Sequence, residues 1–241
     1  MPKGLQHKGI VRRNKMIYAA VKLFLENGYE KTTTTSIAKA AGMSPSSFFA
    51  AFDNKEALLL TLVKTMFGSQ FDKAEKLLGE TPDPLLVYGV EVSIQMYIAE
   101  LSEPLRELYV VGYSLPTTSE YIYMRTAQKI QHIFSQYIKE AELKDFYEMD
   151  IASAGITRGF MAKKCDLYFT MENKLRRLLK CCFTLYKVPE AKQEEVIGQC
   201  NLIQIGLHFS YCTTNSSIHC FCCHISPLLV NVVNLLLQTF H

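Results

Sequence analysis

Apolar residues recur along most of the chain at spacings of three and four, which is the period of an amphipathic α-helix. The first stripe of this kind consists of Met16, Ile17, Ala20, Val21 and Phe24. Gly28 follows this stripe and is a suitable residue to end the helix. No segment shows the alternation of apolar and polar residues that a half-buried strand requires, so the sequence predicts an all-α fold.

Further helices are expected to begin where a capping side chain or a proline precedes an apolar stripe, because the cap accepts amide protons that lack a helical partner. The expected starts lie at Thr33 or Thr34, Ser44-Pro45, Asp53-Asn54, Asp83-Pro84, Ser102, Pro116, Thr170 and Pro189. At the third of these, Asp53 and Glu56 have the spacing of a capping pair. The helix that they open is expected to run to about Leu78.

Residues 33–52 have the segment lengths and side chains of a helix-turn-helix. Ile37 and Ala38 suit the close contact between the two helices, Gly42 suits the turn, and Phe48 is expected to face back toward the first helix. The outward positions of the second helix are Ser44, Pro45, Ser46, Ser47, Phe49 and Ala50. A helix in the major groove of DNA needs small residues in its leading turns, so this pattern favours a DNA-reading helix.

Charge is distributed unevenly between the start of the chain and the remainder. Residues 1–64 contain ten Lys and Arg against four Asp and Glu, whereas the later residues contain sixteen against nineteen. A basic segment on a mildly acidic body is typical of a part that meets phosphate. The basic side chains of the leading arm are Lys3, Lys8, Arg12, Arg13 and Lys15. The arm is expected to add salt-dependent affinity for DNA, and a solvated tail is the alternative interpretation.

A longer set of residues at fixed spacing surrounds the helix-turn-helix. It comprises Phe24-Leu25-Glu26-Asn27-Gly28-Tyr29, Thr32-Thr33, Ile37-Ala38, Ala41-Gly42-Met43-Ser44, Phe48-Phe49, Phe52 and Lys55-Glu56-Ala57-Leu58. This set resembles the amino-terminal domain of the TetR family of bacterial transcriptional regulators, over about the first quarter of the chain. The resemblance implies a helical, usually homodimeric repressor that binds double-stranded operator DNA. The DNA-binding residues that it implies are Thr33, Thr34, Ser44, Pro45, Ser46, Ser47, Phe49 and Lys55.

Some of these residues receive particular roles from the resemblance. Thr33 would cap the second helix and bind a phosphate, and Lys55 would pair with a backbone phosphate. Phe49 departs from the family, which commonly has a tyrosine there whose hydroxyl binds phosphate. Losing one neutral hydrogen bond costs about 1 kcal/mol, so a weakened but retained affinity is expected. No Arg, Gln or Asn lies at the outward positions, so the strongest discriminators between bases are absent.

The chain is expected to divide into a helix-turn-helix domain at 1–64, a helical effector-binding and dimerisation domain at 65–197, and an uncharged Cys-rich tail at 198–241. In the family, the body holds an effector pocket. Aromatic residues and methionines in the body suit a small, largely apolar effector, although each is also a candidate core residue. They are Tyr88, Met96, Tyr97, Tyr109, Tyr113, Tyr121, Tyr123, Met124 and Phe134.

The resemblance also implies a homodimer built from the last two long helices. The segment 170–186 carries an apolar stripe and, on its other side, basic residues, so it is expected to be one dimer helix. The stripe consists of Leu175, Leu178, Leu179, Cys182 and Tyr186, and the basic residues are Lys174, Arg176, Arg177 and Lys180. The segment after Pro189 is expected to be the other dimer helix.

The chain after Glu195 contains no Asp, Glu, Lys or Arg, yet it holds five of the eight cysteines. Three interpretations compete: half of a buried interface, a membrane anchor, and a reading frame that slipped near residue 198. The anchor is disfavoured because the apolar run 227–240 is shorter than the roughly 20 residues that a spanning helix needs. The frame slip is preferred, because a surface helix would keep some charged residues and here every charge is lost at one point. A frame slip would weaken the dimer.

Other kinds of chemistry receive little support. No nucleophile–base pair, metal triad or phosphate-cradling glycine loop is present, so neither enzymatic activity nor a cofactor is expected. The crowded cluster from His219 to His224 lacks the ligand spacing of a zinc site, so no metal is expected. The basic start lacks the apolar run of a signal peptide, which favours the cytoplasm, reduced cysteines and no membrane partner.

The predicted function is therefore transcriptional regulation, by a repressor that a small-molecule effector releases from its operator. The alternatives are a helical small-molecule-binding protein, and a relic that does not dimerise and has no regulatory activity.

Overall fold

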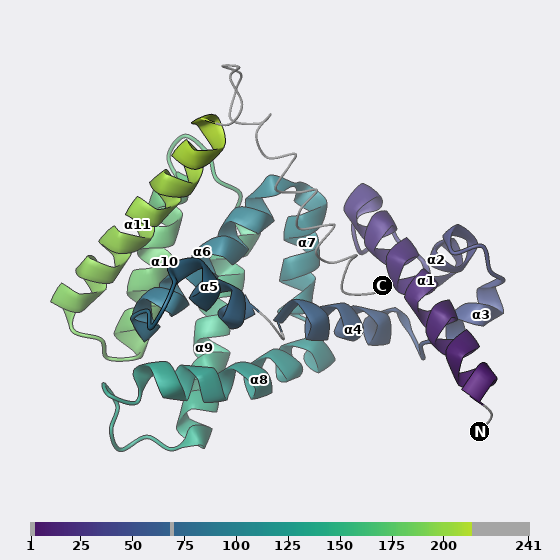
Figure 1. Cartoon of the computed structure of the whole chain (residues 1–241), viewed down its shortest axis with the longest axis horizontal. Helices are drawn as coiled ribbons and strands as arrows, with labels where there is room; N and C mark the ends of the chain where they lie inside the picture. Colours follow the sequence, from purple (N-terminus) through teal and green to yellow (C-terminus); the bar gives the residue numbers. More distant parts are fainter. Residues whose placement is uncertain (1–2, 68–69, 214–241) are drawn as a thin grey trace.

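The computed structural model describes residues 3–67 and 70–213 (Figure 1), and within them it contains eleven helices and no strand. The all-α prediction is confirmed. The helices are α1 (Lys3–Asn27), α2 (Thr34–Ala40), α3 (Pro45–Phe49), α4 (Lys55–Phe67), α5 (Gln70–Leu78), α6 (Pro84–Leu101), α7 (Glu103–Gly112), α8 (Pro116–Phe134), α9 (Leu143–Ala162), α10 (Met171–Leu185) and α11 (Glu190–Thr213). Helices α1–α3 form a small group at one end, and α5–α11 form the larger body.

Most helix starts lie where the capping residues predict them. The side chains of Thr33, Asp83, Ser102 and Thr170 each accept a hydrogen bond from a backbone amide in the first turn of α2, α6, α7 and α10. Prolines occupy the first turn of α3, α6, α7 and α8, where a missing amide proton costs nothing. Local side-chain chemistry therefore sets these boundaries.

Two expectations about helix boundaries are wrong, and one helix start was not expected. Asn54, rather than Asp53, caps α4, because its Oδ1 accepts the amide of Ala57 over 2.7 Å. In place of the single helix expected up to Leu78, the structure has α4, which ends at Phe67, and α5, which begins at Gln70. The start of α9 was not expected. A reciprocal capping box of Glu142 and Asp145 forms it.

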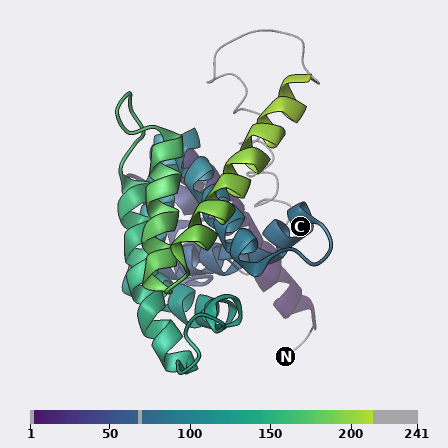
Figure 2. The ribbon, with the colours of Figure 1, turned by 90° about the vertical axis from the view of Figure 1, so that its left-hand side faces the viewer.

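Helix α6 lies at the centre of the body and packs against α5 and α7–α11. Its sequence between Pro84 and Ala99 is apolar apart from a few positions, and nearly all of that stretch is buried. A helix that is apolar all round is expected to be surrounded by other helices. Figure 2 shows α11 crossing one side of the body beside α10.

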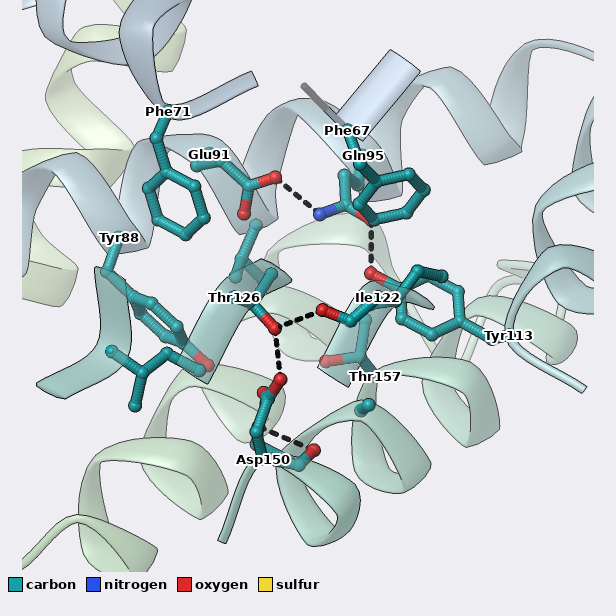
Figure 3. A pocket seen from close by; sticks show the side chains of 14 residues that line it. Phe67, Phe71, Tyr88, Glu91, Gln95, Tyr113, Ile122, Thr126, Asp150 and Thr157 are labelled. Carbon is teal, nitrogen blue, oxygen red and sulfur yellow. Dashed lines mark hydrogen bonds between the residues drawn. The ribbon is translucent and has the colours of Figure 1, made fainter. Parts of the chain in front are cut away.

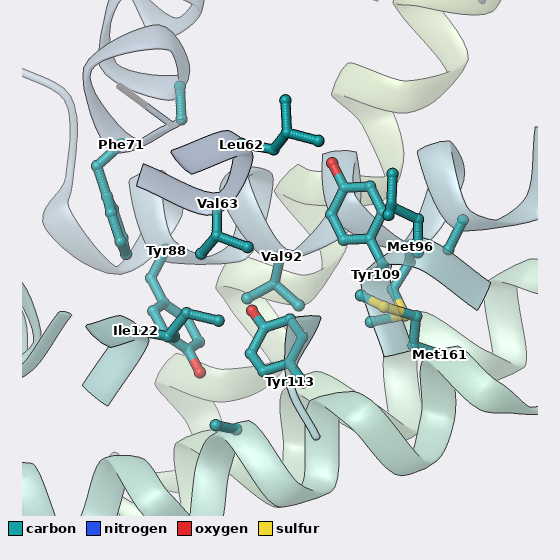
Figure 4. Close-up of a cluster of buried hydrophobic side chains, with 14 of the residues drawn as sticks. Leu62, Val63, Phe71, Tyr88, Val92, Met96, Tyr109, Tyr113, Ile122 and Met161 are labelled. Atoms are coloured by element: carbon teal, nitrogen blue, oxygen red, sulfur yellow. The ribbon is translucent and has the colours of Figure 1, made fainter. Parts of the chain in front are cut away.

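Helix α4 connects the small group to the body. Its residues Leu62 and Val63 are buried in a cluster with side chains of α6 and α7, including Val92, Tyr109 and Tyr113 (Figure 4). The domain boundary predicted at residue 64 thus falls within a helix whose side chains pack into the body. The buried residues of the two parts form one continuous hydrophobic cluster.

The apolar stripe of α10 is buried within the subunit itself. Leu175, Leu178, Leu179, Cys182 and Tyr186 are all buried, and the ring of Tyr186 stacks on Phe134 of α8 with centroids 4.1 Å apart. The stripe therefore belongs to the core and does not offer a free apolar face. Arg176 and Lys180, opposite it, form ion pairs with Glu194 of α11 at 2.6 and 2.7 Å.

Lys174, which the sequence analysis placed among the basic residues opposite the stripe, is fully buried. Its ammonium donates to Oε1 of Glu100 on α6 over 2.5 Å and to the backbone carbonyl of Lys163. Arg106 of α7 also pairs with Glu100, at 3.2 Å. A buried ionic network thus joins α6, α7 and α10.

The predicted tail begins inside α11, which continues past residue 198 to Thr213. Residues 214–241, including the cluster from His219 to His224, lie outside the described residues. No helix in the described ranges is long and apolar enough to cross a membrane.

Candidate DNA-binding surface and ligand cavity

Helix α2 is capped at its start, and a glycine turn joins it to α3. Thr33 and Ser36 exchange two hydrogen bonds, each 3.0 Å long, between the side chain of one and the amide of the other. Gly42 adopts a φ of +72°, which glycine tolerates best, and the amide of Met43 donates to the carbonyl of Ala38 over 2.9 Å. These contacts hold α3 at a set angle to α2 (Figure 1).

Helix α3 presents small polar side chains to solvent and one aromatic side chain to the core. Phe48 is fully buried, as predicted, with its ring 5.8 Å from that of Phe52. Of the predicted DNA-contacting positions on α3, Ser44, Pro45, Ser46 and Phe49 are exposed and Ser47 is half-buried. Together they form the solvent-exposed surface of α3, which a reading helix requires.

The three serine hydroxyls of this face interact with one another. Ser44 Oγ lies 3.0 Å from Ser46 Oγ and 2.9 Å from Ser47 Oγ. Ser44 is the N-cap by position, but its side chain makes no capping bond to the backbone. Beside them, Phe49 has 60% of its surface exposed, so a large ring projects where the family commonly has a tyrosine.

Lys55 is held by the loop between α1 and α2, a contact that the sequence did not indicate. Its ammonium donates to the backbone carbonyls of Tyr29 and Thr32 over 2.9 and 3.1 Å and lies 4.0 Å from the centroid of the Tyr29 ring. An ammonium has three protons to donate, so one remains for a phosphate. Thr34 lies half-buried at the first position of α2, next to the cap Thr33.

The leading basic arm is helical from Lys3 onward rather than a tail. Arg13 donates to the carbonyl of Ala51 over 2.8 Å and to Thr61 Oγ1 over 3.0 Å, and its guanidinium lies 4.1 Å from the centroid of the Phe52 ring. This arginine therefore fastens α1 to the segment that joins α3 to α4. Arg12 and Lys15 are exposed.

A cavity of about 30 Å³ lies inside the body between α6, α7, α8 and α9, with the end of α4 and the start of α5 beside it (Figure 3). Its walls are formed by Phe67, Phe71, Tyr88, Glu91, Val92, Gln95, Tyr113, Ile122, Thr126, Ile130, Asp150, Ser153, Ala154 and Thr157. Of the aromatic residues and methionines that the sequence analysis proposed for the effector pocket, only Tyr88 and Tyr113 line this cavity. Met96, Tyr109 and Phe134 are buried in the core, and Tyr97 and Met124 are exposed.

Two hydrogen-bonded chains cross the cavity, each centred on a buried carboxyl group. Gln95 donates to Glu91 Oε1 over 2.5 Å, and Tyr113 donates to Gln95 Oε1 over 2.8 Å. On the other side, Asp150 accepts hydrogen bonds from Thr126 and, over 2.8 Å, from Ser153. Figure 3 shows both groups directed toward the cavity.

Neither carboxyl forms a salt bridge in the described part of the chain, so burial dominates their acidity. Burial raises the pKa of Glu91 to about 7, the hydrogen bond from Gln95 opposes this rise, and the charge of Asp150 adds to it. Burial likewise raises the pKa of Asp150 to about 6, against the hydrogen bonds from Thr126 and Ser153. The sequence analysis missed both. The available signal was that Glu91 is the single charged residue between Pro84 and Ala99.

A second, open hollow of about 320 Å³ lies on the surface between α8 and the segment that joins α5 to α6. Lys129 lies in its wall and pairs with Asp72 and Glu75 at 3.5 and 3.7 Å. Among the described residues, no group of His, Cys, Asp and Glu has an arrangement that could hold a metal ion.

The helix-turn-helix lies in the part of the chain that is similar to known protein sequences. The family model described as bacterial regulatory proteins of the tetR family matches residues 17–62. The fatty acid metabolism regulator protein of Bacillus subtilis is 36% identical over 62 residues, which cover 26% of this chain and 32% of that protein. The negative transcriptional regulator IcaR of the biofilm operon of Staphylococcus epidermidis is 30% identical over 104 residues, 43% of this chain and 55% of its own length. The chain thus matches about a third to a half of the length of these relatives.

Solved structures share the fold over most of their length at low identity. RolR in complex with resorcinol aligns with a TM-score of 0.62 and 16% identity, covering 80% of this chain and 95% of that one. The FadR repressor of Thermus thermophilus in complex with lauroyl-CoA aligns with a TM-score of 0.54 and 19% identity, covering 71% and 93%. The match over residues 17–62 shows that the chain carries the amino-terminal helix-turn-helix domain of the tetR family of bacterial regulatory proteins, and the solved structures show the same all-helical fold for the remainder.

Proposed function

We propose that this chain is a transcriptional repressor that binds operator DNA through α3 and loses affinity for it when a small molecule occupies the body. The observation that carries the proposal is the exposed surface of α3. Small hydroxyl side chains lie there, while Phe48 of the same helix is buried and anchors it to the core. The names of the relatives support it. IcaR is a negative transcriptional regulator, and FadR of Thermus thermophilus is a repressor in complex with lauroyl-CoA.

On the DNA side, α3 would lie in the major groove. The hydroxyls of Ser44, Ser46 and Ser47 can donate to or accept from base edges and phosphates, and the ring of Phe49 can contact a thymine methyl group. Thr33 and Thr34 at the start of α2 and the third proton of Lys55 would reach backbone phosphates. Phosphate contacts fix the register of the protein, whereas contacts to bases select the sequence.

On the ligand side, α7 links the cavity to the DNA-binding group. Tyr113, just after the helix, lines the cavity, and Glu107, one and a half turns earlier, accepts a hydrogen bond from the amide of Glu30 after α1. A Cβ at Gly112 would lie 3.6 Å from Val63 of α4, so α7 and α4 are in close contact. A ligand that shifts Tyr113 would therefore displace α1 and α4, which is the coupling of two sites that effector release requires.

A homodimer in the cytoplasm is part of the proposal, because a single short reading helix gives little selectivity. The apolar stripe of α10 is occupied, so the contact would use the exposed face of α10, with Arg177, Cys181 and Thr184, together with α11. Sedimentation of the purified chain tests this directly, since a monomer at micromolar concentration would contradict it.

A gel-shift titration with DNA from upstream of the chain's own coding sequence tests the DNA-binding activity. The expected result is retardation at submicromolar protein that weakens steeply with added salt. Ser46→Glu, which adds a negative charge on the exposed face of α3, should abolish retardation. Ala152→Glu adds the same charge at an exposed position of α9 and should leave retardation unchanged. Equal retardation by both variants, or none by the unmodified chain, would refute the proposal and favour a ligand-binding protein that does not bind DNA.

A further inference from the structure

We propose that the ligand of the internal cavity carries a positive charge, an organic ammonium or amidinium group on a compact aromatic or apolar body, with Glu91 and Asp150 as its counterions. The inference rests on the proposed ligand response and names the chemical class of that ligand. It replaces the largely apolar ligand that the sequence favours.

The position of the two carboxyl groups is the first argument. Glu91 comes from α6 and Asp150 from α9, each side chain is 96% buried, and both line the same cavity. The hydrogen bonds described for them come from neutral donors, the amide of Gln95 and the hydroxyls of Thr126 and Ser153. Acidic side chains are almost never fully buried without a cationic partner or metal, so an unpaired couple facing one cavity indicates an absent cation.

The other charged and titratable groups around the cavity do not fill that role. No Lys, Arg or His is among the lining residues. The neighbouring titratable groups are the phenols of Tyr88, Tyr113 and Tyr186 and the thiol of Cys182, whose pKa values burial raises, so they stay neutral. Among the described residues that line the cavity, the two carboxyls are therefore the only groups able to carry charge near neutral pH.

The remaining wall suits the apolar part of such a ligand. The rings of Phe67, Phe71, Tyr88 and Tyr113 line the cavity together with the carboxyls, and aromatic faces attract cations. A neutral ligand would leave the carboxyls without a counterion, and an anion would add repulsion. Selectivity for positive charge follows from these penalties as much as from attraction.

The volume of the cavity limits the size of the ligand. At about 30 Å³ it has room for one or two water molecules. A ligand as large as a benzene ring must displace wall side chains. Phe67 at the end of α4 and Phe71 in α5 are among these wall side chains. Binding would then displace the end of α4, the helix that follows the helix-turn-helix in the chain.

Three probes of similar shape and different charge test the inference: benzylammonium, benzyl alcohol and benzoate. Calorimetric titration of the full chain at pH 8 should show benzylammonium binding at least tenfold more tightly than either of the others. The preference should shrink at pH 5, where the carboxyls are protonated. Saturable binding of the alcohol or the benzoate with equal affinity would overturn the inference, as would no saturable binding of benzylammonium.

Variants connect the preference to the two residues. Glu91→Gln and Asp150→Asn keep the shape and hydrogen-bonding capacity of each side chain, and each should reduce the affinity for benzylammonium at least tenfold while leaving the alcohol unaffected. Glu80→Gln, at an exposed position, is the matched control. Circular dichroism confirms that each variant is folded, and if one is not, the other variant decides. Unchanged ammonium binding by a folded Glu91→Gln or Asp150→Asn chain would refute the assignment.

The test of the ligand class can fail independently of the test of DNA binding. Salt-sensitive DNA retardation without ammonium binding would refute the ligand class alone. Ammonium binding without DNA retardation would refute the regulatory function alone.

Discussion

The amide of Glu30 donates a hydrogen bond to Oε1 of Glu107 over 2.8 Å, and this contact ties the end of α1 to helix α7 of the body. Gly28 makes the contact possible. Its φ is +83°, and a Cβ at this position would collide with the Glu107 carboxylate. A residue other than glycine would be strained in its backbone and would displace the carboxylate. This contact therefore adds to the packing of α4 in holding the two parts together, and it requires that position 28 has no side chain.

Removing this acceptor should loosen the DNA-binding group without unfolding the body. Glu107→Ala leaves the amide of Glu30 without its partner, a loss of about 1 kcal/mol locally. Hydrogen exchange should become severalfold faster at residues 28–32 and stay unchanged in α9. Glu148→Ala, at an exposed position of α9, serves as the control. Equal exchange at residues 28–32 in both variants would show that the contact has no role in holding the group.

The capping box of α2 should contribute measurably to stability. Thr33→Ala removes the oxygen that accepts the amide of Ser36, which typically costs about 1 kcal/mol. Thr35→Ala, at an exposed position within the same helix, should change stability by less than about 0.5 kcal/mol. Urea denaturation followed by circular dichroism measures both. Similar midpoints for the two variants would contradict the assignment of Thr33 as the cap.

The buried ammonium of Lys174 should be among the most costly groups to remove. Lys174→Ala leaves Glu100 without a partner that lies at 2.5 Å, and breaking a buried ion pair in this way typically costs about 3 kcal/mol. Lys76→Ala, at an exposed position of α5, should cost less than about 0.5 kcal/mol. Thermal denaturation compares the two. A loss below about 1 kcal/mol for Lys174→Ala would show that the pair is replaced by water.

The same pair predicts the response to acid. Burial alone would raise the pKa of Glu100, but the hydrogen bond and charge of Lys174 and the charge of Arg106 outweigh it, so the pKa is lowered below 4.5. Stability from this group is present above its unfolded pKa and is lost as the pH falls through the lowered value. Stability measured from pH 6 down to pH 3 should therefore fall less steeply for Lys174→Ala than for the unmodified chain.

Glu91 predicts the opposite dependence. Its pKa is raised from 4.5 to about 7, so its contribution to stability is fully present below pH 4.5 and is lost as the pH rises through about 7. Glu91→Gln removes the charge and keeps the shape. It should be more stable than the unmodified chain at pH 8 and about equal to it at pH 4.5, as measured by thermal denaturation across this range. A constant difference at both pH values would show that Glu91 does not titrate in the folded chain.

Helix starts were predictable from sequence because they depend on neighbours along the chain. Thr33, Asp83, Ser102 and Thr170 each cap with their own side chain, so a local motif is enough. The inward direction of Phe48 and the exposure of Ser46 followed from helical period alone. The same reasoning chose Asp53 over Asn54, because sequence spacing cannot show which of two adjacent acceptors reaches the amide.

What the sequence could not predict depends on contacts between distant helices. Lys174 was placed with the basic residues opposite the apolar stripe, yet it is buried, where a carboxylate of α6 and a carbonyl after α9 accept hydrogen bonds from its ammonium. The pairing of Glu91 with Asp150 across a cavity involves residues 59 positions apart in the sequence. Lys55 illustrates the same limit, since its carbonyl partners at Tyr29 and Thr32 lie in a different helical connection.

Helix α3 has five residues, and at 1.5 Å per residue it is about 7.5 Å long. Stacked base pairs rise about 3.4 Å each, so one copy can address only about two or three of them. A DNA sequence of two or three base pairs recurs by chance throughout any bacterial chromosome. We therefore expect the distance between the two α3 helices of a dimer, rather than the base contacts of either one, to select the operator. A change in the spacing of the two half-sites alone would then abolish recognition, even if every base that α3 contacts were kept.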